Sequence, residues 1–200
     1  SGNFVWIIQN VKLEKGNKAT DWSPAPEDMV NELNNLAFDN ENLFRYSRPY
    51  LLNNLNVGDV FLTGRGTMKR DTLWTLSGYD ECYSLTLSSG QSNAYCELKN
   101  EYREMQVVEG QTYYLSLDFA FSEYCTGINV HLYQGNTWIT NLFPLTRTTP
   151  DSNVIKRHGE KSWTATFTGT VYLTIYNAGT LDATKESILY LDNIKFEKGN

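Results

Sequence analysis

The sequence predicts an all-β protein whose strands form an antiparallel two-sheet β-sandwich. Short runs of alternating apolar and polar residues, rich in β-branched and aromatic side chains, follow one another from Phe38 to the end of the chain. Clusters of Gly, Asn and Ser separate these runs, and almost no stretch between them has helical spacing. About ten strands without intervening helices favour the packing of one sheet on another.

One strand-like segment occurs twice, once near each end of the chain. Residues 5–17 read VWIIQNVKLEKGN and residues 188–200 read ILYLDNIKFEKGN, so that six of thirteen aligned positions are identical at an offset of 183 residues. An offset of this length is typical of a whole domain and not of a solenoid repeat. We therefore expect each copy to be the strand that closes one module.

This repeat divides the chain into three parts. Residues 1–22 are expected to be the closing strand of a preceding module, and residues 39–200 a complete β-sandwich. Between them, residues 23–38 form a linker in which Pro24 and Pro26 break the backbone. The apolar residues that follow have the spacing of a short amphipathic helix, which we expect to dock on a neighbouring module or a partner chain.

Alternation also predicts the individual strands of the sandwich. The clearest are residues 113–121 and 128–133, each with one apolar face, and a Gly-Asn turn leads from the second into residues 138–142. Residues 143–161 are polar, contain two prolines, and are expected to form a long loop. Further strands are expected at residues 59–63, 73–76, 83–88, 95–98, 163–167, 171–176 and 189–196.

The last of these strands changes parity in its middle. Leu189 and Leu191 lie on one face of an ideal strand, whereas Ile194 and Phe196 lie on the other. A β-bulge at Asp192-Asn193 would return all four apolar side chains to the same face.

Charge and composition exclude several classes of partner. The net charge of -6 disfavours a nucleic-acid backbone. No apolar run approaches the roughly 20 residues that span a bilayer, so we expect no membrane insertion. Cys82, Cys96 and Cys125 have no CxxC spacing and are expected to be buried free thiols made in a reducing cytoplasm, with a Cys82–Cys96 bridge as the main exception.

The sequence contains no recognisable catalytic motif, and we expect no enzyme activity. A GxSxG elbow is absent, and two histidines cannot supply an HExxH motif or a histidine-rich metal cluster. His131 is interpreted as a solvent-facing strand residue. Acidic residues are available for glycoside hydrolysis, but the sequence does not pair two of them across a cleft.

Aromatic residues exceed what one core of this size requires, with five Trp, thirteen Tyr and nine Phe. Strand parity places several of them on faces opposite the aliphatic residues. Sugar rings pack their C–H surfaces on aromatic faces, and their hydroxyls need polar partners, which the YQGNTW hairpin supplies together with its rings. The candidate carbohydrate-binding residues are therefore Trp138, Trp74, Tyr133, Asn136, Tyr172, Tyr176 and Tyr95.

Two segments resemble known modules. KLEKGNKATDWSPAPED, residues 12–28, is similar to the closing signature of modules in tail and baseplate proteins of phages and prophages of Gram-positive bacteria. The LYLDNIKFEKG ending, residues 189–199, resembles the last strand of jelly-roll carbohydrate-binding modules. These motifs indicate a class of module and carry no ligand-binding residue with them.

The resemblance implies a non-catalytic carbohydrate-binding module of jelly-roll type. Such a module would attach the virion to host cell-wall polysaccharide, with other tail or baseplate proteins or adjacent modules as further partners. The protein would be made in the host bacterial cytoplasm and reside in the phage tail. No cofactor is required, although modules of this kind often hold a structural calcium near the final strand, where Asp192 is the matching position. Asp192 could equally cap the bulge.

Two other functions remain open at this stage. The module could be a structural spacer that holds a neighbouring domain of a tail protein at a set distance. It could also be an accessory module of a glycan hydrolase, or a hydrolase itself. Binding to a wall polysaccharide would distinguish a carbohydrate-binding module from a spacer. Release of reducing ends from that polysaccharide would identify a hydrolase.

Overall fold

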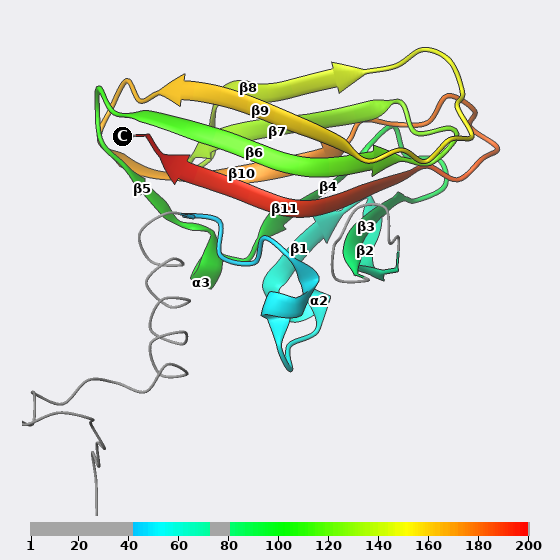
Figure 1. Ribbon diagram of the computed structural model, residues 1–200, viewed down its shortest axis with the longest axis horizontal. Helices are drawn as coiled ribbons and strands as arrows, with labels where there is room; N and C mark the ends of the chain where they lie inside the picture. Colours follow the sequence, from blue (N-terminus) through cyan, green and yellow to red (C-terminus); the bar gives the residue numbers. More distant parts are fainter. Residues whose placement is uncertain (1–41, 73–80, 200) are drawn as a thin grey trace, which may run out of the picture.

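A computed structural model describes residues 42–72 and 81–199, and it confirms the predicted fold class (Figure 1). In this part of the chain, strands β1 to β11 form two antiparallel sheets of six and five strands, stacked as a β-sandwich of jelly-roll type. The predicted strands at residues 5–17 and 73–76 and the predicted linker helix lie outside the described residues.

The six-stranded sheet follows the order β1-β4-β10-β7-β8, with β5 paired to one end of β10. Every neighbouring pair in it is antiparallel. Its strands are β1 (Phe61–Gly64), β4 (Ala94–Leu98), β5 (Met105–Val107), β7 (Gly127–Gln134), β8 (Thr137–Thr146) and β10 (Gly169–Asn177).

The five-stranded sheet follows the order β2-β3-β11-β6-β9, again with all neighbours antiparallel. The C-terminal strand β11 therefore lies at the centre of this sheet, between β3 and β6 (red in Figure 1). Its strands are β2 (Gly66–Asp71), β3 (Cys82–Leu87), β6 (Thr112–Phe121), β9 (Arg157–Thr164) and β11 (Ile188–Lys198).

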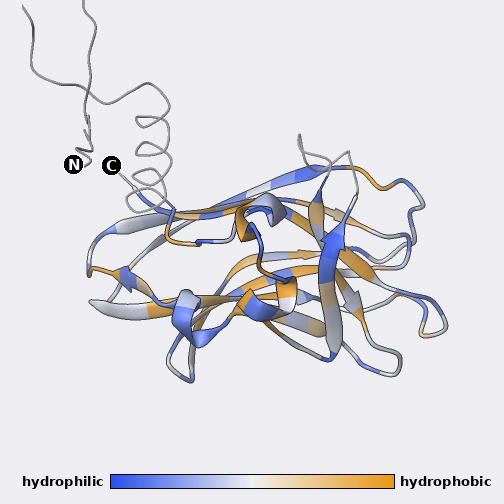
Figure 2. Ribbon diagram, turned by 90° about the horizontal axis from the view of Figure 1, so that it is seen from below, coloured by the Kyte–Doolittle hydropathy of each residue, from blue (hydrophilic) through white to orange (hydrophobic). Residues whose placement is uncertain are grey.

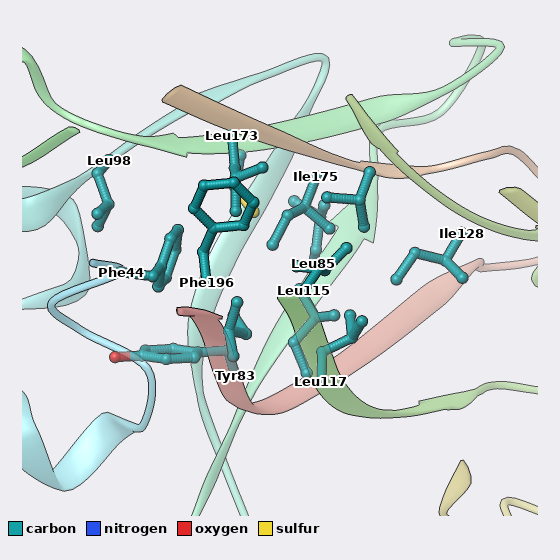
Figure 3. Close-up of a cluster of buried hydrophobic side chains, with 14 of the residues drawn as sticks. Phe44, Tyr83, Leu85, Leu98, Leu115, Leu117, Ile128, Leu173, Ile175 and Phe196 are labelled. Carbon is teal, nitrogen blue, oxygen red and sulfur yellow. The ribbon is translucent and has the colours of Figure 1, made fainter. Parts of the chain in front are cut away.

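The core lies between the two sheets and is built from the apolar positions of the alternating strands. Leu85 and Leu115 of the five-stranded sheet face Leu173 and Ile175 of the six-stranded sheet, and all are almost completely buried (Figure 3). Apolar and polar segments alternate along the strands, as the hydropathy colours of Figure 2 show. This alternation is the physical reason for two stacked sheets, because each sheet has one face to remove from water.

The predicted bulge in the last strand is confirmed. The pairing of β11 with β6 shifts register between Asp192 and Lys195, and Asn193 adopts a φ of 50°. Asparagine tolerates this left-handed conformation better than most residues do. Leu189 and Leu191 before the bulge, and Ile194 and Phe196 after it, are all 0% exposed.

The predicted loop at residues 143–161 is wrong at both ends. Strand β8 continues to Thr146 through Pro144, and β9 begins at Arg157. Because β8 is an edge strand, a proline without an N–H group is tolerated there. Strands β2 and β5 were not expected, since neither shows a clean apolar alternation.

The described helices are short: the 3-10 helix Pro49–Leu52, α2 (Val57–Val60) and α3 (Asn100–Arg103). Helix α2 occupies the start of the strand predicted at residues 59–63, because Asn56 and Asp59 form a capping box at its N-terminus. No helix in the described ranges has both the length and the apolar character needed to cross a membrane.

The three cysteines are buried thiols outside any disulfide, as predicted, and the alternative of a Cys82–Cys96 bridge is wrong. Cys96 points into the core between the sheets, whereas Cys82 packs with Ala120 in a separate small cluster. Burial raises the pKa of the Cys96 thiol well above its usual value. Both side chains therefore act as small apolar residues.

Candidate functional site

Alternation along the strands places a set of aromatic and polar side chains on the outer face of the six-stranded sheet. In β7, Ile128, Val130 and Leu132 are buried in the core, so the residues between them project from the opposite face. The same rule applies to β4 and β10. We call this surface the aromatic face; its residues are Leu62, Tyr95, Glu97, Asn129, His131, Tyr133, Trp138, Asn141, Tyr172, Thr174 and Tyr176, with Arg103 of α3 over one side.

Cross-strand pairing arranges these side chains in rows that run across the strands. The middle row passes from β1 to β8 and consists of Leu62, Glu97, Thr174, His131 and Asn141. Because neighbouring strands are about 4.8 Å apart, a row across five strands extends for about 19 Å. This middle row is largely polar, and the aromatic side chains flank it on both sides.

The first flanking row contains Tyr95, Tyr176 and Asn129. The rings of Tyr95 and Tyr176 lie 5.7 Å apart between centroids, and Asn129 accepts a 2.9 Å hydrogen bond from the Asn141 side chain. Gly64 lies opposite Tyr95 in the adjacent strand, where a Cβ atom would overlap the Tyr95 ring. Glycine at this position therefore leaves room for the Tyr95 ring over β1.

The second flanking row contains Tyr172, Tyr133 and Trp138. The rings of Tyr172 and Tyr133 are stacked, with centroids 5.4 Å apart and an interplanar angle of 13°. The Arg103 guanidinium lies 4.2 Å from the centroid of the Tyr172 ring. Arg103 belongs to α3, which contacts β4 and β10, whereas Tyr133 belongs to β7 on the other side of β10. Arg103 and Tyr133 therefore cover opposite faces of the Tyr172 ring.

Trp138 is the aromatic side chain of this face that is most open to solvent. It is 54% exposed, and its ring meets His131 edge to face at 6.3 Å between centroids. An indole of this exposure offers a flat apolar surface on which a sugar ring can pack. Tyr172, by contrast, offers its edge and its hydroxyl group.

An ion pair lies beside these rings. Arg103 Nη1 is 3.0 Å from Glu97 Oε1, and the Thr174 hydroxyl donates a 2.9 Å hydrogen bond to the other Glu97 oxygen. Glu97 and Thr174 are 8% and 2% exposed, so both carboxylate oxygens are held in a fixed geometry under the aromatic side chains.

Two titratable groups near the centre of the face are perturbed. Burial lowers the pKa of His131, which is therefore neutral at pH 7. The hydroxyls of Tyr133 and Tyr176 lie 3.4 Å apart and join the two flanking rows. Burial and this hydrogen bond raise the pKa of Tyr176, so its hydroxyl remains protonated and can donate.

The structure brings most of the predicted site residues together. Five of them, Tyr95, Tyr133, Trp138, Tyr172 and Tyr176, share the aromatic face. Asn136 is exposed in the β7–β8 turn, two residues from Trp138. Trp74 lies outside the described residues.

Sequence reasoning missed the polar half of this surface. His131, interpreted as solvent-facing, does lie on the outer face, but it is half-buried against Tyr176 at 4.6 Å between centroids. The parity of β4 and β10 would have indicated Glu97 and Thr174. Nothing in the sequence pattern predicts that α3 places Arg103 over the sheet, because that contact depends on how the chain returns between β4 and β5.

Asp192, the candidate calcium ligand, lies on the other sheet beside the bulge in β11. It is 1% exposed and pairs across the strands with Asp118. Burial raises its pKa to about 6. Neither carboxylate oxygen has a hydrogen-bond partner of standard geometry among the described residues, although the Asn193 amide is among the groups that lower its pKa.

The donor set around Asp192 fits calcium in part. Two orphaned carboxylate oxygens suit a cation that takes six to eight oxygen ligands, many of them backbone carbonyls. In the described ranges, however, no cluster of three or more His, Cys, Asp or Glu side chains is placed to hold a metal ion. Any ion here would depend on carbonyl groups for most of its ligands.

No protein-family model and no curated protein matches the chain. Several solved structures are similar to it in fold. One described as "CBM4 structure and function" has a TM-score of 0.49 and 14% identity, covering 70% of this chain and 94% of its own. A carbohydrate-binding module from Cellvibrio mixtus lichenase 5A, in complex with cellotriose, has a TM-score of 0.46 and 9% identity, with coverage of 72% and 95%.

A third similar structure is the enzymatically active domain of tailspike protein 4 from bacteriophage CBA120. It has a TM-score of 0.44 and 7% identity, and the match covers 70% of this chain and 19% of that one. These likenesses concern the fold, and the site described above is built from this chain's own residues.

Proposed function

We propose that residues 39–200 form a non-catalytic carbohydrate-binding module of a phage tail or baseplate protein, which adheres to host cell-wall polysaccharide. The observation that supports this proposal is the aromatic face, an outer sheet surface on which aromatic rows flank a polar row. Trp138 supplies a platform for a sugar ring, and Asn129, Asn141 and Tyr176 supply donors and acceptors for its hydroxyls.

The state of the acidic group on this surface supports binding without catalysis. Canonical glycoside hydrolysis needs a pair of carboxyl groups on either side of the bond that breaks. Glu97 is the single carboxylate of the aromatic face, and both its oxygens are already bonded, to Arg103 and to Thr174. A lone, paired carboxylate is a poor general acid or nucleophile.

A position in the virion would explain how a shallow surface site adheres firmly. Many copies of one module on a tail act together, and their combined avidity exceeds that of each site without any new contact. The support for this location is the resemblance of residues 12–28 to tail and baseplate modules.

The repeated segment supports a chain of modules. Asn193, which adopts the bulge conformation in β11, aligns with Asn10, and the buried Ile194 and Phe196 align with Val11 and Leu13. We therefore propose that residues 1–22 end a preceding module as β11 completes this one, with residues 23–38 as the linker.

Decoration of host cells tests the proposal directly. A fluorescent fusion of the full 200-residue chain is expected to label susceptible Gram-positive cells, and purified wall polysaccharide is expected to compete with that labelling. Failure to label any susceptible strain would favour the structural spacer. Release of reducing ends from the polysaccharide would instead show a hydrolase.

We also propose that Asp192 takes part in a structural calcium site, because its two buried carboxylate oxygens have no hydrogen-bond partner of standard geometry among the described residues. Adding calcium to chelator-treated protein should raise the melting temperature, and Asp192→Asn should remove that increase. A melting temperature that is the same with calcium and with chelator would refute the site and leave carbohydrate binding untouched.

A further inference from the structure

We infer that the ligand of the aromatic face is an uncharged glycan, and that Glu97 sets this preference by neutralising Arg103. The inference rests on the proposed function and specifies its class of ligand. It makes Glu97 a specificity-determining residue and Tyr172 a positioning residue for Arg103.

The first step concerns the charges on the face. Among the side chains of its three rows and Arg103 above them, only Glu97 and Arg103 carry formal charge at neutral pH. They form an ion pair of 3.0 Å, so the surface presents no net charge to a ligand. The whole chain carries a net charge of -6, which adds to the barrier against an anionic polymer.

The second step concerns how firmly this pair is held. The Thr174 hydroxyl binds the second oxygen of Glu97, and the Tyr172 ring lies under the Arg103 guanidinium. Stacking against Tyr133 keeps the Tyr172 ring in place. Since Glu97 is 8% exposed, water screens the ion pair only weakly. If Arg103 moved away, the buried carboxylate of Glu97 would be left without a cationic partner, which is energetically costly.

The third step is the consequence for a ligand. A guanidinium carries five N–H donors, and Glu97 takes a bond from Nη1, so other donors can point toward sugar hydroxyls. An acidic sugar would have to bring its carboxylate close to the buried carboxylate of Glu97. Like charges at such distances repel, which discriminates against acidic glycans while leaving neutral ones unaffected.

A glycan array is the first test. It should carry neutral oligosaccharides beside uronic-acid oligosaccharides of the same length. The full chain is expected to bind neutral members and none of the acidic ones. Stronger binding to the uronates would overturn the inference and leave carbohydrate binding standing. Binding to no member of the array and to no wall polysaccharide would overturn both.

Substitution of Glu97 is the second test. Glu97→Gln removes the negative charge and keeps an acceptor for Thr174, so affinity for the acidic oligosaccharides is expected to rise about tenfold, with little change for the neutral ones. Glu101→Gln is the matched control, because Glu101 is an exposed acid on the same helix as Arg103 and should change neither. In the double variant Glu97→Gln/Arg103→Gln, the gain should disappear.

Two results would contradict the role of Glu97. One is an unchanged preference in a folded Glu97→Gln variant, and the other is an equal gain in Glu101→Gln. Should Glu97→Gln melt at a much lower temperature than the wild type, salt dependence decides the question with the native chain. Lowering the NaCl concentration should then leave the uronates unbound, and uronate binding that appears at low salt and is lost as NaCl is added would show that Arg103 attracts the carboxylate and would overturn the inference.

Discussion

Trp138→Ala is the most direct perturbation of the aromatic face. A Trp side chain offers up to about 250 Å² of surface, and the 54% exposure of Trp138 leaves roughly 130 Å² of it open. A sugar ring that covers about half of that area removes about 65 Å² from water, which at about 25 cal/mol per Å² stabilises the complex by about 1.6 kcal/mol. The variant should therefore bind roughly tenfold more weakly.

The assay is isothermal titration of the full chain with the polysaccharide that the wild type binds. Tyr114→Ala is the matched control, since Tyr114 is 52% exposed on β6 of the other sheet. Both rings are largely solvated, so neither variant should lose more than about 1 kcal/mol of stability in a denaturant titration. Equal affinities of Trp138→Ala and wild type would refute the assignment of Trp138 as a platform, and so would an equal loss in Tyr114→Ala.

Three further perturbations follow from the structure. Gly64→Ala places a methyl group where the Tyr95 ring lies, so affinity for the polysaccharide should fall several-fold while the melting temperature changes little. Wild-type affinity in this variant would show that Tyr95 takes no part in binding. Leu173→Ala opens a cavity between the sheets and should lower the free energy of unfolding, measured by urea titration, by about 2–5 kcal/mol. A loss below about 1 kcal/mol would contradict the position of Leu173 in the core. Hydrogen bonds to Asp118 and Glu160 raise the pKa of His158, so the stability that protonated His158 contributes is complete below pH 6.5 and is lost as the pH rises through the raised pKa. His158→Gln should therefore reduce the change of the melting temperature with pH over that range. A variant with the same pH profile as the wild type would contradict the contact.

The sequence predicted most of the fold because burial imposes a period of two on a strand. Alternation identified β6, β7, β10 and β11, and even located the bulge at Asn193, because four apolar residues of β11 must reach one core. Two edge strands, β2 and β8, were predicted less well. β8 continues through Pro144, and no residue of β2 is fully buried, so neither strand shows an apolar alternation along its whole length.

The candidate site was predictable only in its aromatic half. Strand parity places Tyr133, Tyr172 and Tyr176 opposite the core, and one sheet then brings them onto one surface. How much of each ring is covered depends on neighbouring side chains from other strands and from α3. Tyr172 is covered on both faces, whereas Trp138 at the edge remains open.

The sequence by itself determined the class of fold, the closing strand with its bulge, and the surplus of aromatic side chains on faces that a core does not need. These are local properties, because periodicity and turn chemistry act over a few residues. Only the tertiary structure decided the strand order, and with it the rows that combine β1, β4, β10, β7 and β8. The physical reason is separation along the chain. Glu97 and Thr174 are 77 residues apart, Arg103 and Tyr172 are 69 residues apart, and no local pattern encodes contacts over such separations.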